Sequence, residues 1–339
     1  MEEVLLAFGL TGEAKPFGSG HINSTFKVQS DKGIFLLQRI NTNVFKDVEG
    51  LMKNIHKVTG HLQKSLVGTN QETFSIFSSR FSKLVFEDPE GGCWRCMEFK
   101  AGLLSYDIPP SADYIYQGAK SYGHFIQGLR ALNPDALVET IPNFHYLSFR
   151  LQQLQAAIDS RTDTLDCELE LSKVKALSAE LQVLDEMRTK QIIPLRTTHN
   201  DTKFNNVLLD ENGIGRCVID LDTVMPGIVH YDFGDGARTT STQVPEDEPD
   251  LQRVEVDPYR YQAFKEGFME PTADWLTSYE QEYLPISGAY MSFIMSVRFL
   301  TDHINGNIYY KVNFPEQNLQ RARCQLKLAE DFWKRRKDL

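Results

Sequence analysis

The chain has 339 residues, of which 41% are hydrophobic and 24% are charged, an ordinary composition for a globular protein with a sizeable core. A chain of this length typically forms roughly two domains. The formal net charge of −10 argues against a protein that binds nucleic acid through a general positive field.

Signals for membrane insertion, secretion and disulfide bonding are weak. The N-terminus has no basic region and only a short apolar run, unlike a secretory signal. Residues 284–300 form the most apolar later stretch, but Pro285 and Arg298 interrupt it, so we expect a buried core helix. The five cysteines are scattered, and we expect Cys93 and Cys96 to be strand residues rather than a zinc pair. We therefore expect a cytoplasmic protein that binds neither nucleic acid nor a membrane.

The first hundred residues predict a small lobe made of a sheet and one helix. Two β-rich runs around a glycine-containing turn are typical of a hairpin, and a later run has apolar residues at helical spacing. The predicted elements of this lobe, residues 1–100, are a hairpin over 15–40, a helix over 44–62 and strands over 83–86 and 93–99 around a turn at 88–92.

Residues 101–339 predict a larger and mainly helical lobe. Residues 194–224 differ, because they combine short apolar runs with a polar loop and a glycine-containing turn, as in a functional loop on a rigid scaffold. Residues 243–258 are acidic and contain proline, so we expect an exposed connection. Helices are predicted over 111–132, 144–160, 166–190, 257–269, 276–303 and 315–336.

The strongest chemical signal is the sequence His-Asn-Asp-Thr-Lys-Phe-Asn-Asn at 199–206, with Asp220 following Asp201 by 19 residues. Phosphoryl transfer needs a carboxylate that orients and deprotonates the acceptor hydroxyl, oxygen ligands for Mg²⁺, and a cation near the transferred group. Asp201 can supply the first, Asn206 and Asp220 the second, and Lys203 the third. The alternative is that Asp201 and Asn206 only cap the loop.

This segment resembles the H-x-D-x-K-x-x-N catalytic loop of the kinase superfamily. The chain is similar over most of its length to the aminoglycoside phosphotransferase and choline-kinase-like family. Within that family, the runs GHIN, LQRIN, HNDTKFNN, IDLDTVMPG, DFGDGAR and RFLTDHINGNIYYKV resemble bacterial N-acetylhexosamine 1-kinases. The resemblance implies an α+β, bilobal protein-kinase-like fold with ATP and Mg²⁺ as cofactors. It also implies that an amino sugar, N-acetylglucosamine or N-acetylgalactosamine, receives the γ-phosphate on its anomeric hydroxyl.

A literal Asp-Phe-Gly occurs at 232–234, but it lies 31 residues beyond the candidate base, too far for the metal motif of kinases. Asp220 matches that motif instead. We expect Asp232 and Asp235 to brace the loop and His199 to be structural.

The nucleotide is expected to bind the small lobe. A Gly-Ser-Gly turn lets backbone N–H groups approach phosphate oxygens. The resemblance makes Arg39 the basic residue for the α- and β-phosphates, with Glu49 as the nearest candidate for its acidic partner; the alternative is an exposed strand arginine. It also places the hinge between the lobes at the end of CWRCMEF. The predicted ATP-binding residues are Gly18, Ser19, Gly20, Arg39, Glu98 and Phe99.

The acceptor is expected to lie against the large lobe. Arg298 ends an apolar stretch, and a buried arginine needs a partner, either a sugar or Asp302 four residues on. Sugar sites also favour planar polar side chains and an aromatic face. The predicted substrate-binding residues are His21, Asn23, Asp201, Arg298 and Tyr309.

Other readings of the same motifs remain open. Relatives imply choline, homoserine, methylthioribose or an aminoglycoside as acceptors, and cationic acceptors would favour an acidic, aromatic pocket. A catalytically silent ATP-binding pseudokinase would share the fold, but it would typically lose one of the three polar centres that are present here. We expect a monomer or a weak homodimer.

Overall fold

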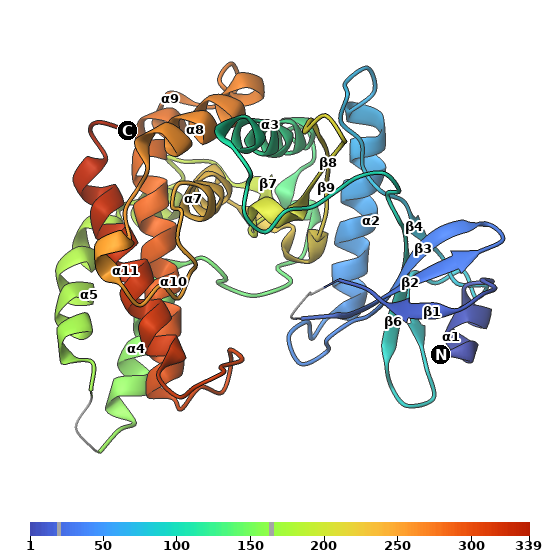
Figure 1. Cartoon of the computed structure of the whole chain (residues 1–339), viewed down its shortest axis with the longest axis horizontal. Coiled ribbons are helices and arrows are strands. Elements are labelled where there is room, and N and C mark those ends of the chain that lie inside the picture. Colours follow the sequence, from blue (N-terminus) through green and yellow to red (C-terminus); the bar gives the residue numbers. More distant parts are fainter. Residues whose placement is uncertain (19–21, 163–165) are drawn as a thin grey trace.

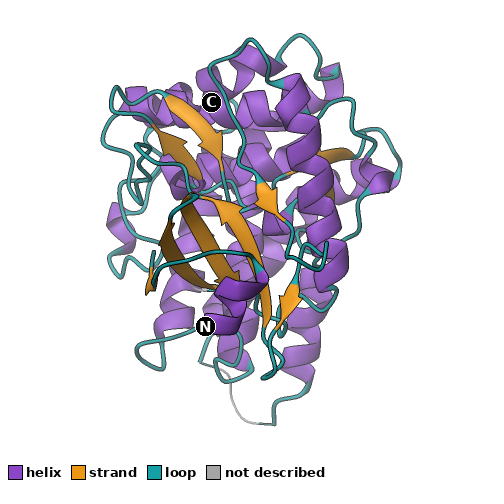
Figure 2. Cartoon of the chain, turned by 90° about the vertical axis from the view of Figure 1, so that its right-hand side faces the viewer, coloured by secondary structure: helices purple, strands orange, loops and turns teal. Residues whose placement is uncertain are grey.

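The computed structural model describes residues 1–18, 22–162 and 166–339, and it has a small lobe and a large lobe that lie side by side (Figure 1). The small lobe holds a sheet and the large lobe is mainly helical, which confirms the expected α+β bilobal architecture. Figure 2 looks from the side of the small lobe, with strands in front of helices. Each helix in the described ranges is too short or too polar to span a bilayer.

The small lobe is built on a six-stranded sheet in the order β1-β2-β3-β6-β4, with β5 also paired to β6. Its elements are α1 (Glu2–Ala7), β1 (Ala14–Pro16), β2 (Ser24–Ser30), β3 (Gly33–Arg39), β4 (Ile76–Phe77), β5 (Phe86–Glu87) and β6 (Cys93–Glu98). Because side chains alternate along a strand, Phe35 and Leu37 point to one face and Leu36 and Gln38 to the other. The first face packs with α1 in its own apolar cluster, and Leu36 packs against the core of the large lobe.

Helix α2 (Val48–Ser65) joins the small lobe to the core of the large one. It begins at Asp47, whose side chain accepts the N–H of Gly50 at 2.8 Å. Its apolar stripe belongs to the same buried cluster as the helices of the large lobe. Asn54, also buried, donates to the carbonyl oxygens of Val138 and Val224 at 2.8 and 3.0 Å. Helix α2 is therefore bonded to large-lobe segments by both apolar and polar contacts.

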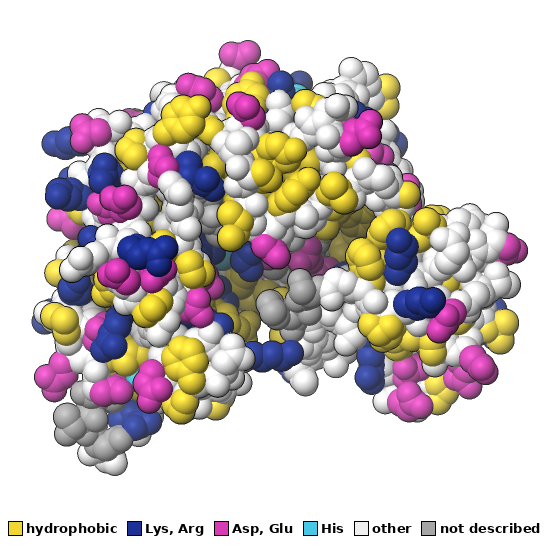
Figure 3. Space-filling model, viewed as in Figure 1, with side chains coloured by type: hydrophobic (Ala, Val, Ile, Leu, Met, Phe, Trp, Pro, Cys, Tyr) yellow, Lys and Arg dark blue, Asp and Glu magenta, His cyan; other side chains and the backbone are white. Residues whose placement is uncertain are grey.

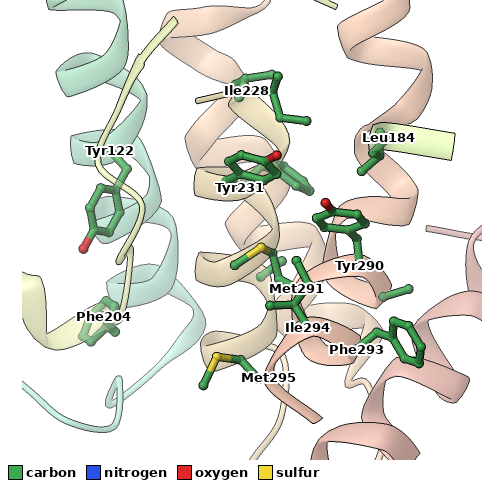
Figure 4. Close-up of a cluster of buried hydrophobic side chains, with 14 of the residues drawn as sticks. Tyr122, Leu184, Phe204, Ile228, Tyr231, Tyr290, Met291, Phe293, Ile294 and Met295 are labelled. Atoms are coloured by element: carbon green, nitrogen blue, oxygen red, sulfur yellow. The ribbon is translucent and has the colours of Figure 1, made fainter. Parts of the chain in front are cut away.

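The large lobe is a set of packed helices around small two-stranded sheets. Its helices are α3 (Ala112–Gly128), α4 (Leu147–Asp159), α5 (Glu168–Leu181), α6 (Val183–Thr189), α7 (Val229–Thr240), α8 (Pro258–Thr272), α9 (Ser278–Tyr283), α10 (Ser287–Ile304) and α11 (Gln317–Arg335). Helices α3 and α8 lie so close that a Cβ added at Gly267 would be 2.2 Å from the carbonyl oxygen of Tyr116. Figure 4 shows Tyr231 of α7 stacked near Tyr290 of α10, with ring centroids 5.9 Å apart.

Several predicted elements are displaced or subdivided. The strand expected at 83–86 is only β5, and helix α7 falls where no helix was predicted. The segment 243–258 was expected to be exposed, but Glu248, Val254 and Val256 are buried in it. The helix predicted over 166–190 is α5 followed by α6, and that over 276–303 is α9, a short 3-10 turn and α10.

Candidate active site

The candidate catalytic loop is carried by two short sheets of the large lobe. Their strands are β7 (Arg196–Thr198), β8 (Val207–Leu209), β9 (Gly215–Val218) and β10 (Met225–Gly227). Strand β7 pairs with β10 and β8 with β9, so the loop 199–206 runs from one sheet to the other. Ile219 continues the β8–β9 pairing by donating its N–H to the carbonyl oxygen of Asn206 at 2.9 Å. This pairing brings Asn206 and Asp220 to neighbouring positions.

His199 connects the start of the loop to the strand that follows it. Its Nε2 donates to the carbonyl oxygen of Ile219 at 2.9 Å, and its Nδ1 accepts the N–H of Asp201 at 3.2 Å. The ring packs edge-on against Tyr122 and Phe125. Burial lowers the pKa of His199, which keeps the ring neutral. These contacts are those of a structural residue, in agreement with the sequence-based expectation.

Helix α7 supports the loop from beneath. The buried Asp232 accepts the N–H groups of His199 and Asn200 at 2.8 and 2.7 Å. The literal Asp-Phe-Gly is therefore part of this helix, and its aspartate is bonded to the loop backbone. Asp235 instead pairs with Arg238, with Oδ1 at 2.8 Å from Nη2. Of the two acids expected to brace the loop, Asp232 makes that contact directly.

Asp201 is oriented by two side chains of its own loop. Lys203 Nζ lies 3.2 Å from Asp201 Oδ1. Asn206 Nδ2 donates to the Asp201 backbone carbonyl at 2.9 Å and to its Oδ2 at 3.3 Å. The Asp201 charge raises the pKa of Lys203, which stays protonated. The Asp201 side chain remains 25% exposed, so its carboxylate is both fixed and accessible.

Asp220 completes an oxygen-rich group of side chains at the cleft. It has a left-handed backbone with φ of +59°, and its side chain is exposed. Desolvation deep between the lobes nevertheless raises the pKa of Asp220, and the carboxylates of Asp222 and Asp201 raise it further. A divalent cation would relieve this repulsion. Asn206 uses its amide nitrogen on Asp201, which leaves its amide oxygen for a cation, and such hard oxygen ligands fit Mg²⁺.

Figure 3 shows a hollow between the lobes, with acidic side chains deep inside it. On the small-lobe side, Gly18 has a φ of +78°, a backbone conformation that favours glycine. Ser19, Gly20 and His21 lie outside the described residues, so the structure does not place their predicted contacts.

Arg39 lies on the other face of the sheet from the catalytic loop. It ends β3 on the same face as the α1 cluster, and its guanidinium lies against Gly92 in the β5–β6 turn. Its proposed partner Glu49 pairs with Lys53 at 2.8 Å. The β3 side chain that points to the large lobe is Gln38, one residue earlier, because neighbouring strand residues face opposite ways. The structure therefore does not bring Arg39 together with the other candidate residues.

Glu98 and Phe99 lie at the end of β6, where the chain passes to the large lobe. Their N–H groups donate to the carbonyl oxygens of Ser75 at 2.9 Å and Ile34 at 3.3 Å. An adenine bound through these two N–H groups would have to replace bonds within the small lobe.

Arg95 is a small-lobe cation that does reach the catalytic segment, although sequence analysis did not single it out. It lies opposite Gln38 across the β3–β6 pair and is 2% exposed. Its Nη1 donates to Asp222 Oδ1 at 2.5 Å, across the boundary between the lobes. The available signal was a charged residue inside the apolar run CWRCMEF, which is unusual unless the charge has a buried partner.

Arg298 lies on helix α10 of the large lobe and packs against aromatic rings. Its guanidinium stacks on the rings of Phe144 and Tyr310, 4.9 and 5.6 Å from their centroids. Asp302, the alternative partner, accepts the backbone N–H groups of Tyr309 and Tyr310 instead. Within the described part of the chain, no carboxylate forms an ion pair with Arg298.

A chain of contacts connects Arg298 to the catalytic loop. The Phe144 ring packs on His145 with centroids 4.1 Å apart, and His145 Nε2 donates to the carbonyl oxygen of Asn200 at 2.7 Å. Asn200 precedes Asp201 directly. These contacts therefore link Arg298 to the residue that precedes Asp201, within the large lobe.

The other two described acceptor candidates differ from each other. Tyr309 is 58% exposed and packs edge-on against Tyr310, so its ring is accessible. Asn23 has both ends of its amide occupied, because Nδ2 donates to Asp222 at 2.6 Å and Oδ1 accepts the N–H of Asn41 at 2.9 Å. This geometry gives Asn23 a structural contact rather than a free group for a sugar.

Known structures share this fold over almost the whole chain. A choline/ethanolamine kinase family protein from Mesorhizobium loti superposes with a TM-score of 0.60 at 15% identity, covering 99% of this chain and 92% of that one. The streptomycin–ATP–APH(2")-IIa ternary complex gives 0.58 at 14% identity, with 98% and 96% covered. A microcompartment-associated aminopropanol kinase gives 0.62 at 14% identity, with 99% and 97% covered. These similarities confirm the protein-kinase-like fold.

The family is shown by sequence as well. Residues 13–264 match the model of the phosphotransferase enzyme family APH, and the matched range includes the whole catalytic loop and Asp220. The chain therefore belongs to the APH family of small-molecule phosphotransferases, as its aminoglycoside-phosphotransferase-like and choline-kinase-like motifs predicted.

Proposed function

We propose that the protein is an ATP-dependent and Mg²⁺-dependent kinase that phosphorylates the anomeric hydroxyl of an N-acetylhexosamine. The catalytic part of the proposal rests on Asp201, Lys203, Asn206 and Asp220, which meet at the floor of the cleft. Their contacts supply the base, the cation and the oxygen ligands that phosphoryl transfer needs. The complex of APH(2")-IIa with ATP and streptomycin supports ATP as the donor.

The proposed step is a direct transfer to the acceptor hydroxyl. The anomeric oxygen forms a bond to the γ-phosphorus while the bond from that phosphorus to the β–γ bridging oxygen breaks, and ADP leaves. The hydroxyl proton passes to the carboxylate of Asp201. Lys203 balances negative charge beside the transferred group, and Asn206 holds Asp201 in place. When bound by Asn206 and Asp220, Mg²⁺ would neutralise the phosphate oxygens.

The observation that favours a sugar over a cationic acceptor is the guanidinium of Arg298, which pairs with no carboxylate among residues 1–18, 22–162 and 166–339. A second arginine, Arg150, donates to the carbonyl oxygen of Phe144 at 2.7 Å, beside the ring on which Arg298 stacks. Burial lowers the pKa of Arg150 to about 10, and the positive charge of Arg298 contributes. Positive charge at this wall would repel choline or a polyamine. Sugar hydroxyls and an acetamido carbonyl can accept hydrogen bonds from a guanidinium and pack on the exposed ring of Tyr309.

The direct test is ADP release from Mg-ATP across a panel of N-acetylhexosamines, other sugars, amino alcohols and aminoglycosides. Turnover confined to N-acetylhexosamines, with loss of reducing-end reactivity in the product, is the expected result. Turnover on choline, homoserine, methylthioribose or an aminoglycoside would overturn the proposed acceptor. A sugar product that keeps a reducing end would overturn the proposed position.

A further inference from the structure

The small lobe holds the segment that follows Asp220 through a buried carboxylate. Asp222 is 3% exposed, and both of its side-chain oxygens accept hydrogen bonds from small-lobe residues. Arg95 Nη1 donates to Oδ1 at 2.5 Å and Asn23 Nδ2 donates to Oδ2 at 2.6 Å. Its backbone carbonyl accepts from Thr140 in the large lobe at 3.0 Å. Asp222 is therefore one point at which the two lobes meet, two residues from the candidate metal ligand Asp220.

The donors to Asp222 are themselves fixed within the sheet. Arg95 donates through Nε at 2.9 Å and through Nη2 at 2.6 Å to the side-chain oxygen of Gln38, on the neighbouring strand. Gln38 in turn donates to Thr25 of β2 at 2.9 Å. Residues of three strands thus fix the orientation of the Arg95 guanidinium. A planar, bidentate donor of this kind fixes direction as well as charge.

Asp220 lies between two sets of fixed neighbours. Its backbone is left-handed, with a φ of +59°, a conformation that residues other than glycine adopt less often. On its N-terminal side, Ile219 is held by its bond to Asn206. On its C-terminal side, the first side-chain anchor is Asp222, two residues on. The direction of the Asp220 carboxylate is thus set between the large-lobe bonds to Ile219 and the small-lobe bonds to the Asp222 side chain.

We propose that Arg95 and Asp222, with Gln38 and Asn23, form an interlobe latch that positions Asp220 for the metal. Arg95 and Asp222 are positioning residues, because they act through Asp220 rather than on the substrate. Docking of the sheet onto the large lobe then assembles the metal site. The inference rests on the proposed function in one respect, the binding of Mg²⁺ by Asp220. It is independent of which acceptor is phosphorylated.

The test compares two substitutions of the same chemistry in the full-length protein. Asp222→Asn keeps the shape of the side chain but loses the charge and one acceptor toward Arg95 and Asn23. Glu280→Gln is the matched control, because Glu280 is fully buried and binds Arg196 at 2.6 and 2.7 Å, within the large lobe. ATP binding is measured by calorimetry at a series of Mg²⁺ concentrations, and Mn²⁺ binding with ATP by electron paramagnetic resonance. Denaturant unfolding reports the stability of each variant.

We expect Asp222→Asn to raise the Mg²⁺ concentration needed for half-maximal ATP binding by about tenfold, as for residues that orient metal ligands. Gln38→Met removes the side-chain oxygen that holds Arg95 and leaves Asp222 unchanged. This variant should also raise the Mg²⁺ concentration needed for half-maximal ATP binding, but by less than Asp222→Asn does. Glu280→Gln should leave it unchanged while lowering stability. If Asp222→Asn needs the same Mg²⁺ concentration as the wild type and loses stability as the control does, the proposal is overturned. Arg95 and Asp222 would then form an ion pair that stabilises the fold without positioning Asp220. If Mg²⁺ does not increase ATP binding by the wild-type protein, both the proposed function and the latch are overturned. If only the sugar panel shows no turnover, the proposed acceptor fails and the latch proposal stands.

Discussion

The two walls of the cleft differ in how their charges are matched. At the catalytic floor, the described acids outnumber the described cations, since Asp201, Asp220 and Asp222 lie near Lys203 and Arg95. At the acceptor wall, Arg298 lies on aromatic rings with no acid paired to it in the described part of the chain. An excess of carboxylate suits a divalent cation, and an unpaired guanidinium suits a neutral, oxygen-rich ligand. Under the proposed function, one wall would bind the phosphates and the metal, and the other would select the acceptor.

The largest expected effect is at the catalytic floor. Asp201→Asn should lower kcat by several orders of magnitude, about 4 kcal/mol or more in activation free energy, because the amide cannot take the hydroxyl proton. ATP affinity should be retained. Steady-state ADP release and calorimetry check the two parts, and near-normal turnover would remove Asp201 as the base.

The next effect distinguishes the candidate metal ligand Asp220 from the candidate base Asp201. Asp220→Ala should weaken Mg²⁺-dependent ATP binding more than Asp222→Asn does, by more than about tenfold, because it removes a ligand rather than its support. ATP titrations with and without Mg²⁺ measure this. Equal Mg²⁺ dependence in the variant and the wild type would exclude Asp220 from the metal site.

A smaller effect belongs to the acceptor wall. Arg298→Met keeps bulk on the Phe144 ring but removes the donors, so the acceptor KM should rise by about 10- to 100-fold while the KM for ATP stays constant. Initial-rate kinetics with each substrate varied in turn distinguish the two constants. If only the KM for ATP changed, the assignment of Arg298 to the acceptor site would be wrong.

The last effect is on stability rather than on binding or catalysis, and it concerns His145, which connects the two walls. Burial lowers the pKa of His145 to about 3, whereas an unfolded histidine titrates near 6.5. Below pH 6.5 the unfolded chain therefore binds a proton that the folded chain excludes, and stability falls with pH by about 1.4 kcal/mol per unit from this residue. His145→Gln should flatten the stability profile between pH 6 and 4 by about that slope. Urea unfolding across the range measures it, and parallel profiles for the two proteins would contradict it.

Much of the fold and the proximity of the candidate catalytic residues could be predicted because their signals are local. Helical spacing marks α2 and α10, and the candidate base, cation and amide ligand all lie within 199–206. Helix α7 was missed because two glycines and two aspartates in its DFGDG run lower helix propensity, and tertiary burial on nearly all sides compensates. Propensity alone cannot report that burial.

The partners of charged side chains were harder to predict than the helices, the strands and the candidate catalytic loop. Arg39 was predicted because it lies on the strand where the resemblance implies a basic residue for the phosphates, yet side-chain alternation turns it to the α1 face. Arg95 reaches Asp222 across 127 positions of sequence, a contact that no local pattern encodes. In the same way, Arg298 and Asp302 have the spacing of a helical ion pair, but the Asp302 carboxylate accepts the backbone N–H groups of Tyr309 and Tyr310 instead.

The packing of α2 has a consequence for how the protein could be divided or could move. A cut at residue 100, where composition suggests a boundary, would strip the apolar stripe of α2 from its partners in α3 and leave Asn54 without its two carbonyl acceptors. Such a fragment would expose a core surface to water and could not be transplanted as a nucleotide-binding module. By the same contacts, α2 belongs mechanically to the large lobe, so opening of the cleft would swing the sheet and α1 away from a body that keeps α2.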